Sequence, residues 1–224
     1  MEATSALSQA NIPATQAPAR LRMTYDEFLK WEHPGIAEWV DGEVTVVAVK
    51  NDHQRVVDFL IQVIGLYLRI MMMGVVRSAP FVMRAIPNGP GREPDVMVVT
   101  SDHLDRITHD QLDGPADLVI EVVSEESVSH DRSEKFYEYQ DAGVREYWVI
   151  DPRPNRQRAD FYVLDTSGRY RPVPIADDGT YHSTVLPGFW LDVDWLWAEE
   201  PDALKALAHI IGPDKMAEAM RSAR

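Results

Sequence analysis

Two short apolar runs, each with one carboxylate, constrain the fold of this chain more than any other feature. Residues 96–99 follow Glu93-Pro94-Asp95, and residues 118–123 hold Glu121 in their interior. Short β-branched runs of this kind are typical of buried strands. An unpaired carboxylate in such a strand would be costly or would take up a proton. We therefore expect a positive group between Asp95 and Glu121, and a divalent metal ion is the simplest candidate.

Length and composition indicate an ordinary globular protein. A chain of 224 residues suits one domain with extensions. No apolar run is long enough to predict a membrane span. The absence of cysteine excludes disulfides and thiolate metal sites, and the N-terminus lacks a signal-peptide pattern, so we expect the cytoplasm. The net charge of −14 disfavours tight, non-specific coating of DNA. Clustered carboxylates that hold a cation, or a locally basic groove, could still reconcile this acidity with nucleic-acid binding.

Local signals predict the order of elements. Residues 1–22 are expected to be a disordered tail, residues 23–200 one domain, and residues 201–224 a helical tail. Asp41-Gly42 between two β-prone runs predicts a hairpin over 37–49, after a short helix that a capping box opens at Thr24. Apolar periodicity predicts a helix over about 53–73, capped by Asn51 or Asp52.

The remaining elements complete a mixed α/β pattern. A strand is expected over 75–85, a helix from about 131 to 142 that ends at Gly143, and a strand over 146–151. Residues 53–151 thus predict the order αβββαβ. A hairpin precedes this core, and a β-rich extension follows it. The apolar long helix and the tryptophans at 190, 195 and 197 favour a homodimer.

Five side chains are candidates for a catalytic site. Asp95 and Glu121 would hold Mg²⁺ or Mn²⁺, which prefer oxygen ligands, and Glu38 could be a third acidic ligand. His53 could ligate the metal or carry a proton. Lys135 could stabilise charge developing on phosphorus.

Each candidate also has a purely structural interpretation. Asp95 could cap a turn, Glu121 could pair with an arginine, and Glu38 could be a solvated strand residue. His53 could be a structural residue of a first helical turn. Lys135 could form an exposed ion pair on its own helix, with Asp131 or Glu138.

Taken together, these residues resemble the Uma-type putative restriction endonuclease family of the PD-(D/E)XK nuclease superfamily. The resemblance rests on Glu38 before Asp41-Gly42, His53, Glu93-Pro94-Asp95, Glu121-Val122-Val123-Ser124, Lys135 with Tyr139, and Gly143-Val144 leading to Glu146-Tyr147-Trp148 and Asp151.

The resemblance implies a restriction-endonuclease-like core and Mg²⁺-dependent hydrolysis of DNA phosphodiesters. Asp95 and Glu121 would be the metal ligands, and Glu38 would complete the acidic cluster. The superfamily places a lysine two residues after the second acid, where this chain has Val123. Lys135 would replace it from the following helix.

Two other functions remain open at this point. One is a nuclease-fold module that binds DNA or a protein partner without catalysis, which Val123 and the acidic composition favour. The other is a glycoside hydrolase that uses the carboxylates as acid and base. The short chain and the lack of an aromatic sugar-binding cluster disfavour the glycoside hydrolase.

Overall fold

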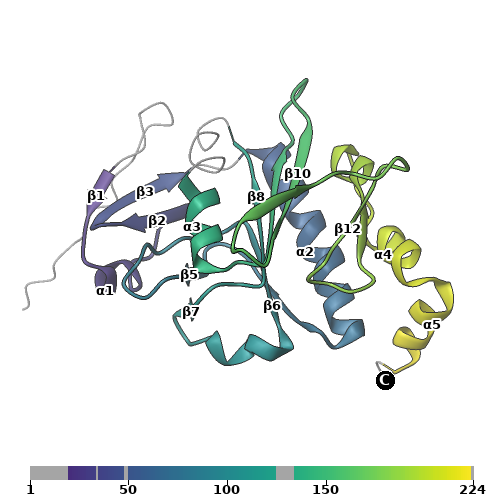
Figure 1. The fold of residues 1–224 in the computed structure, drawn as a ribbon, viewed down its shortest axis with the longest axis horizontal. Coiled ribbons are helices and arrows are strands. Elements are labelled where there is room, and N and C mark those ends of the chain that lie inside the picture. The colour runs from purple at the N-terminus through teal and green to yellow at the C-terminus, as the bar shows by residue number, and fades with distance from the viewer. Residues whose placement is uncertain (1–19, 34, 48–49, 125–133, 223–224) are drawn as a thin grey trace, which may run out of the picture.

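The computed structural model describes residues 20–33, 35–47, 50–124 and 134–222 (Figure 1). Its main sheet has six strands in the order β11-β10-β9-β8-β6-β4. The pair β8–β9 is parallel and the other pairs are antiparallel, so the sheet is mixed. The strands are β4 (Gly74–Arg77), β6 (Val96–Thr100), β8 (Leu118–Val122), β9 (Glu146–Asp151), β10 (Arg158–Leu164) and β11 (Tyr170–Val173).

Two helices complete the core and cover opposite faces of the sheet. Helix α2 (Asn51–Met71) precedes β4, and α3 (Lys135–Ala142) connects β8 to β9. The order α2-β4-β6-β8-α3-β9 is the predicted αβββαβ core. Val96 and Val98 of β6 pack in the cluster that contains α2, whereas Met97 and Val99 pack in the cluster that contains Tyr139 of α3. Because β6 is covered on both faces, its sequence is a continuous apolar run.

A three-stranded sheet, in the order β1-β3-β2, precedes the core. Strands β2 (Ile36–Val40) and β3 (Glu43–Val47) form the predicted hairpin, and Asp41 and Gly42 both adopt positive φ, as a type I′ turn requires. The predicted capping box at Thr24 opens α1 (Tyr25–Phe28). Strand β1 (Arg20–Arg22) pairs with β3, so the last three residues of the predicted tail form a strand. Residues 1–19 and 48–49 lie outside the described residues.

Two local predictions were wrong. The strand predicted over 75–85 is divided into β4 and β5 (Val82–Arg84), because Pro80 lacks the N–H that a continuous ladder needs. Strand β5 pairs instead with β7 (Gln111–Asp113), which follows the 3₁₀ helix η1 (Ser101–Arg106).

The second wrong prediction concerns the cap of α2. Its N-cap is Lys50, which has an extended backbone, whereas Asn51 and Asp52 are already helical. The side chain of Lys50 makes no capping hydrogen bond. The end of α3 at Gly143 agrees with the prediction, but residues 131–133 of its predicted start lie outside the described residues.

The C-terminal part packs against α2. It comprises β12 (Thr180–His182), β13 (Trp190–Asp192), the 3₁₀ helix η3 (Val193–Trp197), α4 (Ala203–Ile211) and α5 (Pro213–Ser222). Helix α4 contacts α2, and Trp195 and Trp197 are partly buried against the same core cluster. The apolar surface that favoured a homodimer is therefore partly used within the chain. Within the described residues, no helix combines the length and the apolar character needed to cross a membrane.

Candidate active site

The strand register places Asp95 and Glu121 at the same level of two paired strands. Val96 of β6 faces Ile120 of β8 in an antiparallel ladder. Asp95 directly precedes Val96 and Glu121 directly follows Ile120. In an antiparallel register these two positions lie opposite each other, one step beyond the Val96–Ile120 pair. Both are buried, with 5% and 3% of their surface exposed. The two runs that dominate the sequence therefore pair, as expected, and bring their carboxylates to one end of the sheet.

The carboxylate of Asp95 is held by a strand and by a helix. Its Oδ2 accepts a hydrogen bond from the backbone N–H of Val122 at 2.7 Å and lies 3.1 Å from Nε2 of His53. His53 belongs to the first turn of α2 and is itself buried. Its Nδ1 is buried and has no hydrogen-bond partner among the described residues. The His53 ring thus fixes Asp95 with one nitrogen and leaves the other unused.

Glu121 binds two side chains of α3. Its Oε1 accepts a hydrogen bond from the hydroxyl of Tyr139 at 2.8 Å and lies 3.1 Å from Nζ of Lys135. Burial and the nearby Glu121 raise the pKa of Tyr139 well above its usual value, so the phenol remains a donor. Lys135 is buried and also lies 2.7 Å from Oε1 of Glu38. Of the two interpretations of Lys135, the structure therefore has the one in which it reaches the carboxylates.

Glu38 projects from the hairpin into the same cluster. Its Oε2 accepts a hydrogen bond from Nη1 of Arg92 at 2.7 Å, while its Oε1 pairs with Lys135. Burial alone would raise the pKa of Glu38, but the positive charges of Lys135 and Arg92 outweigh it and lower this pKa to about 2. Glu38 is therefore an ionised carboxylate with both oxygens engaged, and its side chain is not solvated as the structural interpretation had it.

Sequence reasoning missed Arg92, the second cation of the cluster. Arg92 is buried, and its Nη2 also binds Oε2 of Glu138 on α3 at 2.7 Å. It thereby links the hairpin to α3. The available signal was a basic residue directly before Glu93-Pro94-Asp95, in a region whose acids required a positive partner.

Among the described residues, the cluster has an excess of negative charge. Two cations there face four carboxylates, which leaves two negative charges over when His53 is counted as neutral; the six residues are Lys135, Arg92, Glu38, Glu121, Asp95 and Glu138. Carboxylate oxygens with an excess of two negative charges suit a divalent cation such as Mg²⁺ or Mn²⁺. In the described part of the chain, however, no three His, Cys, Asp or Glu residues are arranged to hold a metal. Mg²⁺ often uses only one or two carboxylates, with water and substrate completing its shell, so Asp95 and Glu121 fit such an ion.

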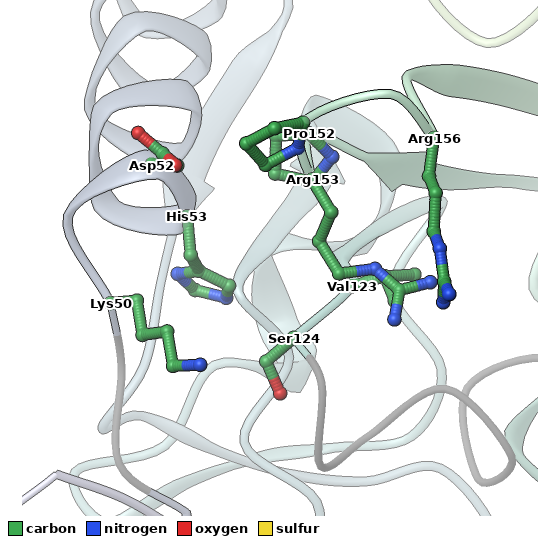
Figure 2. A pocket seen from close by; sticks show the side chains of 9 residues that line it. Lys50, Asp52, His53, Val123, Ser124, Pro152, Arg153 and Arg156 are labelled. Atoms are coloured by element: carbon green, nitrogen blue, oxygen red, sulfur yellow. The ribbon is translucent and has the colours of Figure 1, made fainter.

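A pocket of about 470 Å³ opens beside the cluster (Figure 2). It lies between the start of α2 and the segment that follows β9, and it reaches Val123 and Ser124, which directly follow the strand of Glu121. The residues that line it are Lys50, Asp52, His53, Val123, Ser124, Pro152, Arg153, Pro154 and Arg156. His53 therefore contacts both the carboxylate cluster and the pocket.

Comparison with known proteins identifies the family. A crystal structure of a putative nuclease of the DUF820 group from Anabaena variabilis superposes with a TM-score of 0.62, covering 78% of this chain and 97% of that chain at 16% identity. This likeness shows a shared fold. No match was found among curated proteins. The family description "Uma2: Putative restriction endonuclease" matches residues 25–194, which include every candidate site residue. The chain therefore belongs to the Uma2 family, as the residues of the sequence predicted.

Proposed function

We propose that this protein is a metal-dependent endonuclease that hydrolyses phosphodiester bonds in DNA. The family membership supports a nuclease and favours it over a glycoside hydrolase. The observation that carries the proposal is the pair Asp95 and Glu121, two buried carboxylates at neighbouring ends of paired strands. The described side chains of their cluster carry an excess of negative charge. A divalent cation is the ligand that such a cluster would bind most favourably.

The proposed mechanism assigns the ligand and charge-stabilising roles to three residues. Asp95 and Glu121 would hold the ion. When bound, Mg²⁺ or Mn²⁺ supplies Lewis-acid polarisation of a phosphoryl oxygen and activation of a water molecule. The ammonium of Lys135 stabilises negative charge that develops on the phosphate oxygens, because it is buried where such interactions are strong. Lys135 thus replaces the lysine that the superfamily places at the position of Val123.

Other side chains position these groups. Glu38 fixes the ammonium of Lys135, and Arg92 fixes Glu38, so the predicted metal ligand Glu38 is assigned a positioning role in this proposal. His53 orients the carboxylate of Asp95, and Tyr139 orients Glu121 through its hydroxyl.

The proposal predicts that Asp95→Asn abolishes DNA cleavage. The substitution keeps the size of the side chain but removes the negative charge that would hold the ion, so cleavage should fall more than about 100-fold. The measurement is relaxation and linearisation of supercoiled plasmid with Mg²⁺ or Mn²⁺. The matched control is Asp26→Asn, which makes the same change at an exposed position on α1 and should cleave like the wild type.

Two results would contradict the endonuclease. Equal cleavage by the wild type and Asp95→Asn would point to a contaminating nuclease. A wild type that binds oligonucleotides but cleaves no DNA with either metal would favour the alternative, a nuclease-fold binding module, for which Val123 at the usual lysine position speaks.

The homodimer and the cytoplasmic location remain predictions. Light scattering on a sizing column decides the first of them, and a monomeric mass would reject the homodimer. Fractionation of cells decides the second, and recovery with the membranes would reject the cytoplasm.

A further inference from the structure

The pocket beside the cluster is lined by basic side chains. Lys50, Arg153 and Arg156 contribute to its wall, and Asp52 is the one carboxylate among the described lining residues. Figure 2 shows the charged ends of the three basic side chains around the same opening, with His53 between Lys50 and Arg153. In a chain with a net charge of −14, this is the kind of locally basic groove that an anionic ligand requires.

The basic side chains differ in how much charge they can offer. Arg153 donates hydrogen bonds from Nε and Nη2 to the two carboxylate oxygens of Asp151, at 2.8 and 2.7 Å, so much of its charge is compensated. Arg156 is exposed and forms no ion pair within the described residues. Arg156 is therefore the residue of the wall whose charge is most available to a ligand.

The start of α2 forms part of the same wall, through Lys50, Asp52 and His53. This helix has 21 residues, and the side chain of its N-cap residue, Lys50, accepts no hydrogen bond from the first turn. Backbone N–H groups at such a helix start, together with the helix dipole, favour an anion. An independent observation comes from His53, which lines the pocket, is 5% exposed, and has a buried Nδ1 without a partner among the described residues.

We propose that this pocket binds a backbone phosphate of a nucleic-acid strand, next to the phosphodiester that reacts. The inference rests on the proposed function and places the substrate of that site. His53 joins the two sites, because its Nε2 lies 3.1 Å from Asp95 while its ring lines the pocket. A strand whose phosphodiester reaches Asp95 and Glu121 thus places a neighbouring phosphate between the start of α2 and Arg156. A free phosphate ion would be bound by the same groups but would gain nothing from this continuity.

The test measures oligonucleotide binding without metal, so that no cleavage occurs. The probe is a fluorescently labelled DNA oligonucleotide, titrated with protein in EDTA at several salt concentrations. Arg156→Glu should weaken binding about tenfold, and Arg156→Ala should lower the slope of log affinity against log salt by about one, as expected for a lost phosphate contact. The matched controls are Arg169→Glu and Arg169→Ala, at an exposed position in the β10–β11 turn, which should bind like the wild type.

Two outcomes would overturn the pocket assignment. The first is an Arg156→Glu protein that binds the oligonucleotide as tightly as Arg169→Glu while both retain the wild-type melting temperature. The second comes from titration with inorganic phosphate: phosphate binding that Arg156→Glu removes, with oligonucleotide binding unchanged, would assign the pocket to a free ion.

Failure of the pocket and failure of the nuclease are distinguishable. Loss of oligonucleotide affinity in Arg156→Glu, in a protein that cleaves no DNA, would support the pocket and reject the nuclease. Cleavage that depends on Asp95, in a protein whose oligonucleotide affinity ignores Arg156, would do the reverse.

Discussion

Single buried carboxylates hold this molecule together at the residue scale, and Asp117 is a clear case. Its Oδ2 accepts hydrogen bonds from the backbone N–H and the hydroxyl of Thr100, both at 2.7 Å. Its Oδ1 lies 2.7 Å from His103 and from Arg145. Asp117 thereby ties the residue before β8 to the end of β6. Burial would raise the pKa of Asp117, but the hydrogen bonds from Thr100 and the charge of Arg145 outweigh it and lower this pKa.

Replacement of Asp117 should change both stability and its pH dependence. Because the pKa is lower in the folded state, the ionised carboxylate stabilises the fold fully at pH values above its unfolded pKa of about 4. This stabilisation is lost as the pH falls through the pKa of the folded state. Asp117→Asn should therefore lower the free energy of unfolding at neutral pH by about 1–3 kcal/mol and flatten its decline in acid. Urea unfolding at neutral and acid pH measures both effects. Equal curves for Asp117→Asn and the exposed control Asp26→Asn would contradict this role.

At this scale, the chemistry was predictable but the partners were not. The burial of Asp95 and Glu121 required a positive group, and Lys135 is one such group in the structure. Arg92 could not be assigned in the same way, because its partners Glu38 and Glu138 come from a distant hairpin and a later helix. No local pattern in the sequence encodes such contacts.

At the scale of elements, Glu146 of β9 joins the C-terminal segment to the sheet. Its side chain is fully buried, and Oε1 accepts hydrogen bonds from the Trp148 indole and the Tyr181 hydroxyl. Its Oε2 accepts from the backbone N–H groups of Thr184 and Val185. One carboxylate thus satisfies donors from β9, from β12 and from the turn after β12.

Glu146→Gln should break some of these hydrogen bonds while the volume of the side chain changes little. The amide nitrogen cannot accept a hydrogen bond, so several buried donors would lose their partner, and the free energy of unfolding should fall by roughly 3 kcal/mol. Urea unfolding followed by tryptophan fluorescence measures the loss. The control is Glu218→Gln on the exposed side of α5, which should leave the midpoint unchanged. A Glu146→Gln protein as stable as this control would show that the contact contributes little.

Elements with a strong local signal were predictable, and those that depend on a distant partner were not. Asp41-Gly42 and Gly143 require positive φ, which a sequence can encode locally, and both turns were predicted. Strand β5 was missed because it forms by pairing with β7, and β6 and η1 separate these two strands in the sequence. The start of α2 at Lys50, whose side chain makes no capping hydrogen bond, contradicts the local preference for Asn51 or Asp52. Such a departure is expected where a helix end serves a ligand.

At the scale of the whole molecule, five elements or their ends converge on the proposed site. The hairpin brings Glu38, α2 brings His53, α3 brings Lys135, and the ends of β6 and β8 bring Asp95 and Glu121. In Figure 1 the hairpin lies beside α3, and α2 lies on the other side of the sheet. The αβββαβ order was predictable from periodicity. The convergence of the hairpin with α3 needed the structure, because no spacing in the sequence relates Glu38 to Lys135.

Divalent-cation binding is the most direct test of a metal held by Asp95 and Glu121. The melting temperature of the wild type and of Asp95→Asn would be followed during titration with Mg²⁺ and with Mn²⁺. A ligand at about 100 times its dissociation constant stabilises the fold by about 2.7 kcal/mol, which corresponds to a rise of about 5–10 °C for a chain of this size. We expect this rise in the wild type and its loss in Asp95→Asn. An unchanged melting temperature of the wild type at saturating millimolar Mg²⁺ and Mn²⁺, or an equal rise in both proteins, would contradict a metal held by Asp95 and Glu121.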